Sequence, residues 1–306
     1  MTDVALSAHQ LSKSYGSRQA VKSIDLEVRR GEVFGFLGPN GAGKTTTIRM
    51  ALGLIRPTGG WVEVLGQDVR SHAGAVLPRV GALVEAPALY SYLSGRDNLK
   101  AFASVLGGVP RSRLDDVIDL VGLGARQRDK VRSYSLGMKQ RLGVAGALLN
   151  DPDLLLLDEP ANGLDPAGIV EMRDLLRQLA ALGKTVFISS HVLAEVQQIC
   201  DRVAIIHLGE VVRTAPVADL LSGHGEFVVN VDDPAAALAL IQTNDWGRAA
   251  RLLDGSLVTP SPGGHGRDLI RFLAVSGIWP DRVRERHQSL EQIFLSLTGN
   301  DNGAIK

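Results

Sequence analysis

The sequence predicts an α/β fold built around a mostly parallel sheet. Short apolar runs at 33–37, 154–157 and 185–188 have the length and composition of strands that are buried on both faces. One helix is predicted at 46–54, and a second follows Asp165-Pro166, which supplies an N-cap and a proline at the first helical position. Strands that alternate with helices are typical of a parallel sheet. Apolar residues recur at helical spacing within the second helix: Ile169, Met172, Leu176 and Leu179.

The length and composition of the chain exclude several classes of protein. The 306 residues leave room for about two domains at ~150 residues each. Lys and Arg together number 33, as do Asp and Glu, so no overall basic charge would attract nucleic acid. The single cysteine, Cys200, cannot form an internal disulfide or a thiolate zinc cluster, which favours a reducing cytosolic compartment. No apolar run approaches the ~20 residues that span a bilayer, and residues 1–4 lack the start of a signal peptide.

Two further regions surround the predicted parallel core. Residues 4–11, 24–28 and 61–65 are expected to be strands that form an antiparallel section beside it. Residues 85–134 contain two amphipathic helical patterns, the first of which begins with a capping box at 94–97. This segment is therefore predicted to be a helical subdomain inserted into the α/β unit.

A second, smaller domain is predicted after the α/β domain. The sequence at 223–225, Gly-His-Gly, is typical of a hinge, so the expected boundaries are 1–222 for the first domain and 223–306 for an accessory domain. No catalytic chemistry is predicted for the accessory domain, and a dimer-bracing or regulatory role is an open alternative for it.

The accessory domain is predicted to have a small α+β fold. Ser289 and Gln292 are expected to cap a final helix. The elements before it follow the order βαββαβ, a ferredoxin-like pattern: a strand at 226–231, a helix after Asp233-Pro234, a hairpin around Asp254-Gly255, a helix at 267–275 and a strand at 278–284.

The segment between the first buried run and its helix is typical of a phosphate-binding loop. Its glycines allow backbone N–H groups to wrap a polyphosphate, and the N-terminus of the helix adds a favourable dipole. Lys44 would reach the β- and γ-phosphates, and the Thr45 hydroxyl would bind Mg²⁺. The pattern predicts that the phosphates are held by a continuous run: Gly38, Pro39, Asn40, Gly41, Ala42, Gly43, Lys44, Thr45 and Thr46.

Two acids, Asp158 and Glu159, follow the apolar run at 154–157. A buried strand would bring Asp158 to the carboxyl edge of the sheet, where it can hold the metal directly or through water. Glu159 is expected to point elsewhere and to act as the base that polarises an attacking water. Such a pair alone is commonly a strand end with two solvated acids, but the upstream phosphate loop favours the catalytic interpretation.

Together with residues 134–141, these motifs resemble the ATP-binding subunit of an ABC transporter, over about residues 4–220. The most diagnostic segment is similar to the family signature Leu-Ser-Gly-Gly-Gln-x-Gln-Arg, with Ser135 and Gly137 at its serine and second glycine. Tyr134, Leu136 and Met138 depart from its commonest form. The resemblance implies a P-loop NTPase fold of ABC type, in which Ser135 and Gly137 bind the γ-phosphate of ATP held by an opposing subunit.

Three further family elements follow in order along the chain. Tyr15 resembles the aromatic residue that stacks on adenine, although alone it would suggest a packing tyrosine. Residues 162–165 match the D-loop, where Asp165 has two expected roles, as a helix cap and as a contact to the second subunit. His191, which follows the run at 185–188, matches the switch histidine at the γ-phosphate.

One position departs from the family pattern in an informative way. Glu85 occupies the place where the family typically has the Q-loop glutamine. Its carboxylate can meet the metal or the attacking water, but its charge beside Asp158 and Glu159 would raise the dependence of activity on Mg²⁺ and pH. A glutamate here resembles the subgroup that exports lantibiotic and bacitracin-type peptide antibiotics, as does the form of the signature. The alternative is a surface glutamate without a metal role.

The resemblance implies an Mg²⁺-dependent ATP hydrolase that drives transport. Two copies, a homodimer, would close head-to-tail over two ATP molecules, with Lys44, Glu159 and His191 as catalytic residues and with Thr45, Asp158 and Glu85 at the metal. Because the sequence shows no membrane span, the permease would be a separate polypeptide, contacted through residues 87–106. The subunit would be soluble when expressed alone and peripheral at the cytoplasmic face of the membrane.

Other classes fit the sequence less well. A soluble, non-transport ABC ATPase of DNA repair or translation is the main alternative, but such relatives usually show coiled-coil insertions, zinc-binding cysteines or two nucleotide domains. A small-molecule kinase or GTPase would have no use for the signature or the D-loop. A non-hydrolysing regulator is a third alternative. The cargo cannot be inferred, because selectivity lies in the permease.

Overall fold

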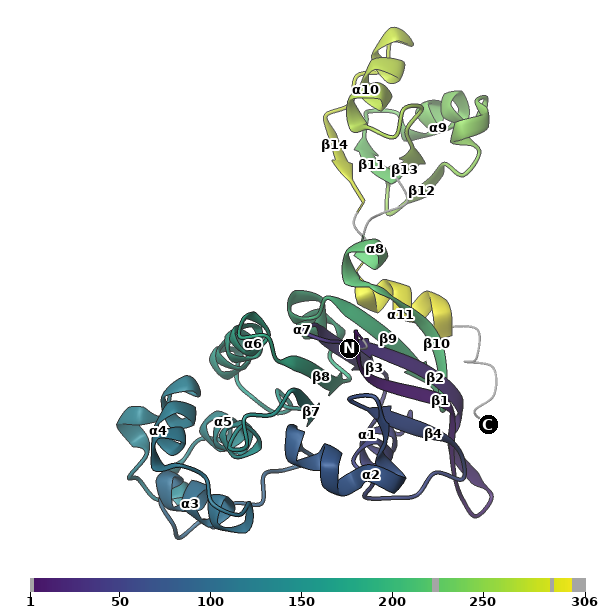
Figure 1. Ribbon diagram of the computed structural model, residues 1–306. Coiled ribbons are helices and arrows are strands. Elements are labelled where there is room, and N and C mark those ends of the chain that lie inside the picture. The colour runs from purple at the N-terminus through teal and green to yellow at the C-terminus, as the bar shows by residue number, and fades with distance from the viewer. Residues whose placement is uncertain (1–2, 222–225, 287–288, 299–306) are drawn as a thin grey trace. The chain divides into compact units, whose positions relative to one another are not determined.

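The computed structural model describes residues 3–221, 226–286 and 289–298. The described residues divide into two compact units. The first comprises residues 3–217 together with Leu297 and Thr298, and the second comprises the described residues from Ala218 to Ser296. Figure 1 shows the elements of both units. The hinge predicted at 223–225 lies outside the described residues, so the boundary placed there stays a prediction.

A six-stranded sheet forms the centre of the first unit. Its order is β10-β9-β3-β8-β7-β6, and all neighbours are parallel except β10, which runs antiparallel to β9. Every residue of β3, β7 and β8 is buried, so the strands predicted from continuous apolar runs are confirmed. The strands are β3 Val33–Leu37, β6 Val80–Leu83, β7 Leu154–Asp158, β8 Thr185–Ser190, β9 Arg202–His207 and β10 Glu210–Pro216.

The predicted antiparallel section is a four-stranded sheet of order β2-β1-β4-β5. Strands β1 and β2 are longer than predicted, because irregular pairing between Ala8 and Leu11 interrupts the alternation of buried and exposed residues. Gln10 has a positive φ of 44° at this irregularity, and Ser23 has one of 46° at the next register shift, between Leu11 and Lys13. The strands are β1 Val4–Tyr15, β2 Arg18–Arg29, β4 Gly59–Val64 and β5 Gln67–Asp68.

The helices of the first unit either contact these sheets or form the helical subdomain. In α1, Ile48 and Met50 belong to the same buried cluster as Leu6 of β1 and Phe187 of β8. Helices α3, α4 and α5 gather at one side of the unit, away from β1 and β2 (Figure 1). The helices are α1 Lys44–Ala51, α2 Val69–Val76, α3 Gly95–Val105, α4 Arg111–Leu120, α5 Leu136–Ala147, α6 Pro166–Ala181 and α7 Leu193–Ile199, with 3₁₀ turns η1 Leu77–Arg79, η2 Gly124–Arg126 and η3 Val131–Ser133. Helix α8 Val217–Leu221 begins at the last residue before the second unit and continues into it.

Side-chain caps occur where the sequence predicts them. Ser94 accepts the N–H of Asp97 at the start of α3, and Asp165 accepts the N–H of Gly168 at the start of α6. Helix α1 begins earlier than predicted, because Gly43 at φ 114° turns the loop directly into it. Within the described ranges, no helix combines the length and apolar character needed to cross a bilayer.

The second unit contains a four-stranded antiparallel sheet of order β12-β13-β11-β14. Residues of α9 and α10 form its core with one face of the sheet, which includes Phe227, Val229 and Leu257. Along the chain the elements are β11 Glu226–Asn230, α9 Pro234–Gln242, the 3₁₀ turn η4 Asp245–Gly247, β12 Arg251–Leu253, β13 Ser256–Pro260, α10 Gly266–Val275, β14 Arg282–Glu285 and α11 Leu290–Thr298.

Two boundaries of the second unit test the predicted pattern. The predicted start of the last strand at residue 278 is wrong, and β14 begins at Arg282 instead. Ile278 still belongs to the end of α10, because its N–H donates to the Leu273 carbonyl at 3.0 Å. This bond closes α10 after Gly277, whose φ is 77°. The predicted capping box of α11 is confirmed, since Ser289 and Gln292 exchange two hydrogen bonds of 3.3 Å.

Candidate active site

A cleft of about 360 Å³ lies at the carboxyl end of β3. Strands β3, β8 and β7 are parallel neighbours, so the residues that follow each strand meet at one edge of the sheet. The lining residues come from β1 and β2, the loop after β3, the start of α1 and the end of β7: Tyr15, Arg18, Ala20, Asn40, Gly41, Gly43, Lys44, Thr45, Thr46 and Glu159.

The loop from Gly38 to Gly43 depends on glycines at its two ends. A Cβ on Gly38 would lie 2.2 Å from the carbonyl oxygen of Ile206, and one on Gly43 would lie 2.6 Å from that of Ala20. The Lys44 ammonium donates to the Gly38 carbonyl at 2.7 Å, which holds its side chain over the loop. The first N–H groups of α1 have no partners within the helix, so the loop and the helix start offer donors to a polyphosphate.

Asp158 is the last residue of β7, and its carboxylate is oriented by two hydroxyl groups. Thr45 Oγ1 donates to Asp158 Oδ2 at 2.7 Å, and Ser189 Oγ donates to Oδ1. Two of the three residues predicted at the metal, Thr45 and Asp158, are therefore in direct contact. Mg²⁺ is usually bound by one or two protein oxygens together with water and phosphate, so this pair fits the ion. The described residues contain no group of three or more His, Cys, Asp or Glu side chains that could hold a metal alone.

Ser189 takes part in the site, although the sequence analysis did not select it. It is buried in β8, pairs in register with Asp158, and also accepts the backbone N–H of Glu159 at 3.0 Å. The available signal was a serine that ends an apolar strand. A hydroxyl buried at that position requires a hydrogen-bond partner, and the neighbouring strand ends in an acid.

Glu159 joins two other residues that were predicted to be catalytic. Its Oε1 lies 3.0 Å from Lys44 Nζ, its Oε2 lies 2.7 Å from His191 Nδ1, and its side chain is 19% exposed. A φ of 52° at Glu159 turns the chain after Asp158, so the consecutive carboxylates reach different partners. With a phosphate bound at Lys44, a carboxylate in this position can accept a proton from water.

The signature and D-loop residues adjoin each other outside the cleft. Ser135 is exposed and caps α5, while Asp165 caps α6. A Cβ on Gly163 would lie 3.2 Å from the Leu136 side chain, which places the D-loop against the signature. Ser135, Gly137 and Asp165 are not among the residues that line the cleft. Within one copy, they do not complete the site.

The structure places Tyr15 and Glu85 in different surroundings. Tyr15 lines the cleft, is about half exposed, and has the Lys13 ammonium 5.1 Å from its ring centroid. Glu85 follows β6, is 64% exposed, and pairs with Arg49 of α1 at 2.5 Å. The sequence predicted Glu85 at the metal with Asp158, whereas in the structure a guanidinium from α1 neutralises its carboxylate.

Comparisons with known proteins identify the family of this chain. A family model described as ABC transporter matches residues 21–162. An uncharacterized ABC transporter ATP-binding protein of Bacillus subtilis, YhcH, is 40% identical over 303 residues, which cover 98% of both chains. The chain belongs to the ABC transporter family. It is the ATP-binding subunit of such a transporter, and it binds and hydrolyses ATP.

Other relatives and solved structures of ABC proteins agree with this assignment. The bacitracin transport ATP-binding protein BcrA of Bacillus licheniformis is 40% identical, with 94% of this chain and 95% of the relative covered. CbiO1 of Clostridium perfringens, part of the ABC transporter complex CbiONQ, superposes with a TM-score of 0.66 at 29% identity, over 72% of this chain and 91% of that one. The predicted ABC-type fold and exporter subgroup are confirmed, and the matched relatives are transport proteins rather than DNA repair or translation factors.

Proposed function

We propose that this ABC subunit is the motor of an exporter of antibiotic peptides or drugs. Two copies bind ATP and Mg²⁺ head-to-tail and act on a separate permease at the cytoplasmic face of the membrane, without a nucleic acid partner. The observation that carries the proposal is the pair of contacts at Glu159, which joins Lys44 of the phosphate loop to His191. A base is thereby held next to the residue that receives the γ-phosphate.

The cleft accommodates the nucleotide from one end to the other. The half-exposed ring of Tyr15 receives adenine, and the loop from Gly38 to Thr46 receives the triphosphate. Thr45 and Asp158 would hold Mg²⁺, which would neutralise phosphate charge there. Glu85 would have to leave Arg49 before its carboxylate could meet such an ion, so a metal role for Glu85 requires a rearrangement of that pair.

Hydrolysis requires Glu159 to exchange one of its partners. A triphosphate carries more negative charge than a carboxylate, so Lys44 moves its ion pair from Glu159 to the phosphates. Oε1 of Glu159 then becomes available to accept a proton from the attacking water, while His191 continues to position Oε2. A general base of this kind contributes ~10²–10⁴-fold to the rate.

A second copy completes each site. Ser135 and Gly137 lie at the N-terminus of α5, where an exposed hydroxyl and backbone N–H groups suit a γ-phosphate presented by another molecule. Asp165 and the adjoining Gly163 would contact the partner copy at the same seam. The placement of these residues outside their own cleft supports a head-to-tail homodimer.

An apolar groove of about 800 Å³ offers a contact surface for the permease. It lies between β6, α3 and α5, and Val105 on its rim is largely exposed. Two glycines of α5 let neighbouring side chains pack closely in this groove, since a Cβ on Gly143 would lie 2.9 Å from Pro87 and one on Gly146 would lie 3.0 Å from Phe102. This groove overlaps the segment at 87–106 that the family resemblance assigns to the membrane subunit.

The cargo class can be tested in the host cell. Deletion of this gene is expected to raise susceptibility to bacitracin, a lantibiotic or daunorubicin, the compounds named for relatives. Complementation with the wild-type chain should restore resistance, whereas Glu159→Gln expressed at the same level should not. Unchanged susceptibility to all three compounds, or full rescue by Glu159→Gln, would contradict the proposed export function.

A further inference from the structure

The sheet of the second unit has an open face that carries a cavity. One face packs on α9 and α10, while the cavity of about 540 Å³ lies on the other. Strand pairing places Arg251, Val258, Val228 and Arg284 in one row across β12, β13, β11 and β14, because each is the register partner of the next. Val228, Val258 and Arg284 line the cavity.

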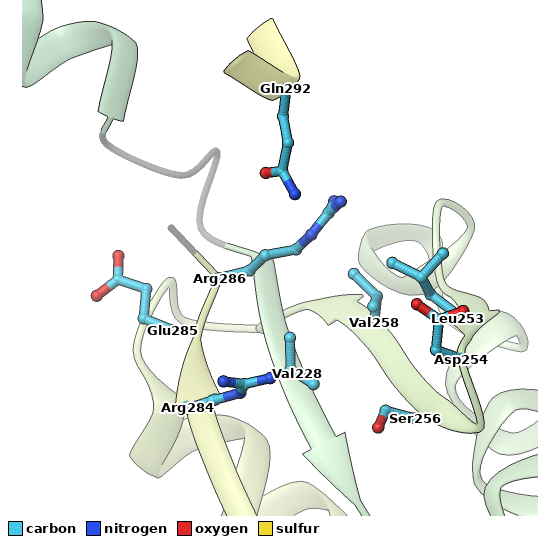
Figure 2. A pocket seen from close by; sticks show the side chains of 9 residues that line it. All are labelled: Val228, Leu253, Asp254, Ser256, Val258, Arg284, Glu285, Arg286 and Gln292. Carbon is cyan, nitrogen blue, oxygen red and sulfur yellow. The ribbon is translucent and has the colours of Figure 1, made fainter. Parts of the chain in front are cut away.

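The walls of the cavity differ in charge, and its floor is apolar. Figure 2 shows Arg284 of β14 and Arg286, the residue directly after this strand, extending toward the hollow, with Val228 and Val258 between the walls. Asp254, in the turn between β12 and β13, lies at the opposite wall (Figure 2). The cavity therefore has an arginine-rich side that also includes Glu285, an apolar floor and a second acid, Asp254, at its far side.

The basic side keeps an excess of positive charge. Arg286 Nη1 lies 2.7 Å from Glu226 Oε2, and Arg251 Nη1 lies 2.6 Å from Oε1 of the same carboxylate. One carboxylate is therefore shared by two guanidinium groups. Arg284 has no acidic ion-pair partner in the part of the chain that the structure describes, although the neighbouring Glu285 also lines the cavity. Around this side, the three guanidinium groups of Arg251, Arg284 and Arg286 therefore outnumber the two carboxylates of Glu226 and Glu285.

We propose that this cavity binds a small organic acid, a single carboxylate or phosphate group on an apolar body. The acid group binds Arg284 and Arg286, whose planar guanidinium groups match carboxylate and phosphate oxygens. The apolar body lies on Val228 and Val258. The volume falls within the ~300–1,000 Å³ that is usual for small-molecule sites. Asp254 disfavours a second acid group at the far wall, so the ligand has one acid end.

Photolabelling of the full chain with 4-benzoylbenzoate tests this site directly. The probe is an apolar benzophenone with one carboxylate, and benzophenone itself is the matched neutral probe. Labelling is expected to saturate and to map, by mass spectrometry, to peptides that contain Val228, Leu253 or Val258. Octanoate and octyl phosphate should both compete and show which acid group binds more tightly, whereas inorganic phosphate alone should not compete.

Two substitutions on opposite walls should have opposite effects. Arg284→Gln is expected to raise the half-saturating probe concentration about 10-fold, since a charge-assisted hydrogen bond is lost. Asp254→Asn should lower it, because repulsion is removed. Arg271→Gln, on α10 outside the cavity, is the matched control and should change nothing. Benzophenone labelling should respond to none of these substitutions.

Several results would overturn the proposal. Labelling distributed over other peptides, no effect of Arg284→Gln, or equal effects on both probes would each show that no acid-binding site exists here. Labelling of this face that appears only when the protein is diluted would show that a second copy of the chain covers the face instead. Arg284 makes no ion pair that the substitution could break, and an unchanged circular dichroism spectrum would verify that Arg284→Gln is folded.

Discussion

The Lys44 ammonium lies 3.0 Å from a carboxylate oxygen of Glu159, in an ion pair that a bound triphosphate must break. Both side chains are largely shielded from water, and the second Glu159 oxygen is held by His191 at 2.7 Å. Arrival of phosphate therefore displaces Lys44 and leaves the base with one unoccupied oxygen. Nucleotide binding and the availability of the base are coupled through this single contact.

Substitution Glu159→Gln separates binding from hydrolysis. The amide keeps the shape of the side chain but cannot accept the proton, so turnover at saturating Mg²⁺–ATP should fall by ~10²–10⁴. Affinity for a fluorescent ATP analogue should stay the same or increase, because the amide does not compete with phosphate for Lys44. Near-wild-type phosphate release by this variant would remove Glu159 from its assigned role.

Substitution Lys44→Ala should abolish tight nucleotide binding. The ammonium is the charged group that bridges the loop carbonyl of Gly38 and the incoming phosphates. Titration with the same fluorescent analogue measures the loss. Lys100→Ala, on the exposed side of α3, removes a lysine that pairs with Asp97 and serves as the control. Retained affinity in Lys44→Ala would count against the phosphate loop.

Substitution Ser189→Ala tests a residue that was found only in the structure. It removes one hydroxyl from Asp158 and one acceptor from the Glu159 N–H, so we expect a loss of stability of about 1–3 kcal/mol. The Mg²⁺ concentration for half-maximal ATPase activity should rise several-fold. Ser190→Ala leaves the contacts of Asp158 in place and should not change the Mg²⁺ dependence. Identical Mg²⁺ curves for both variants would show that Ser189 does not orient the metal-binding carboxylate.

The Arg49–Glu85 pair predicts opposite shifts in the requirement for Mg²⁺. Arg49→Gln releases the Glu85 carboxylate, so less Mg²⁺ should be needed for half-maximal ATPase activity. Glu85→Gln removes the carboxylate and should increase the Mg²⁺ requirement. If both variants match the wild type in a Mg²⁺ titration, Glu85 is a surface residue without a metal role.

Acid should destabilise the second unit through Glu226. Its hydrogen bond to Arg251, and then its bond to Arg286, hold the pKa of Glu226 below its ordinary value of 4.5. Because the folded pKa is the lower one, the stabilisation is complete above pH 4.5 and is lost as pH falls through the folded pKa. Urea unfolding from pH 6 toward acid measures this loss.

Tryptophan fluorescence and a Glu226 variant isolate the contribution of this carboxylate to the stability of the second unit. The chain has three tryptophans, and after Trp61→Phe the remaining two, Trp246 and Trp279, report on the second unit alone. In that background Glu226→Gln should be less stable than its parent at pH 6 and should lose less stability on acidification. Parallel pH curves for the two proteins would contradict the assignment.

The parts of the site that could be predicted are those whose positions are determined within one continuous segment of sequence. Gly38, Gly43 and Lys44 are required by the shape of one continuous loop, and Asp158 is required by the end of one buried strand. The roles of Ser189 and Arg49 depend on contacts between segments that are distant in sequence. No pattern in the sequence reports that Arg49 of α1 faces the residue after β6.

In the fold, too, features set within one segment could be predicted, whereas features set by contacts between segments could not. The buried parallel strands were predictable because an apolar run of five or six residues has few alternatives. The full lengths of β1 and β2 were not, because residues such as Gln10 and Ser23 interrupt the alternation at irregular pairing. The delayed start of β14 depends on a hydrogen bond from Ile278 back to α10, which composition does not reveal.

ATPase activity in mixtures of two inactive variants tests most directly whether each ATP is cleaved between two copies. Lys44→Ala destroys the phosphate loop of its own copy, and Ser135→Arg destroys the signature that serves the partner copy. In a mixed dimer both defects fall in one site, and the other site is intact. We predict that each folded variant is inactive alone and that mixing restores hydrolysis. A mixture as inactive as its components, or full activity of Ser135→Arg at high dilution, would contradict the account.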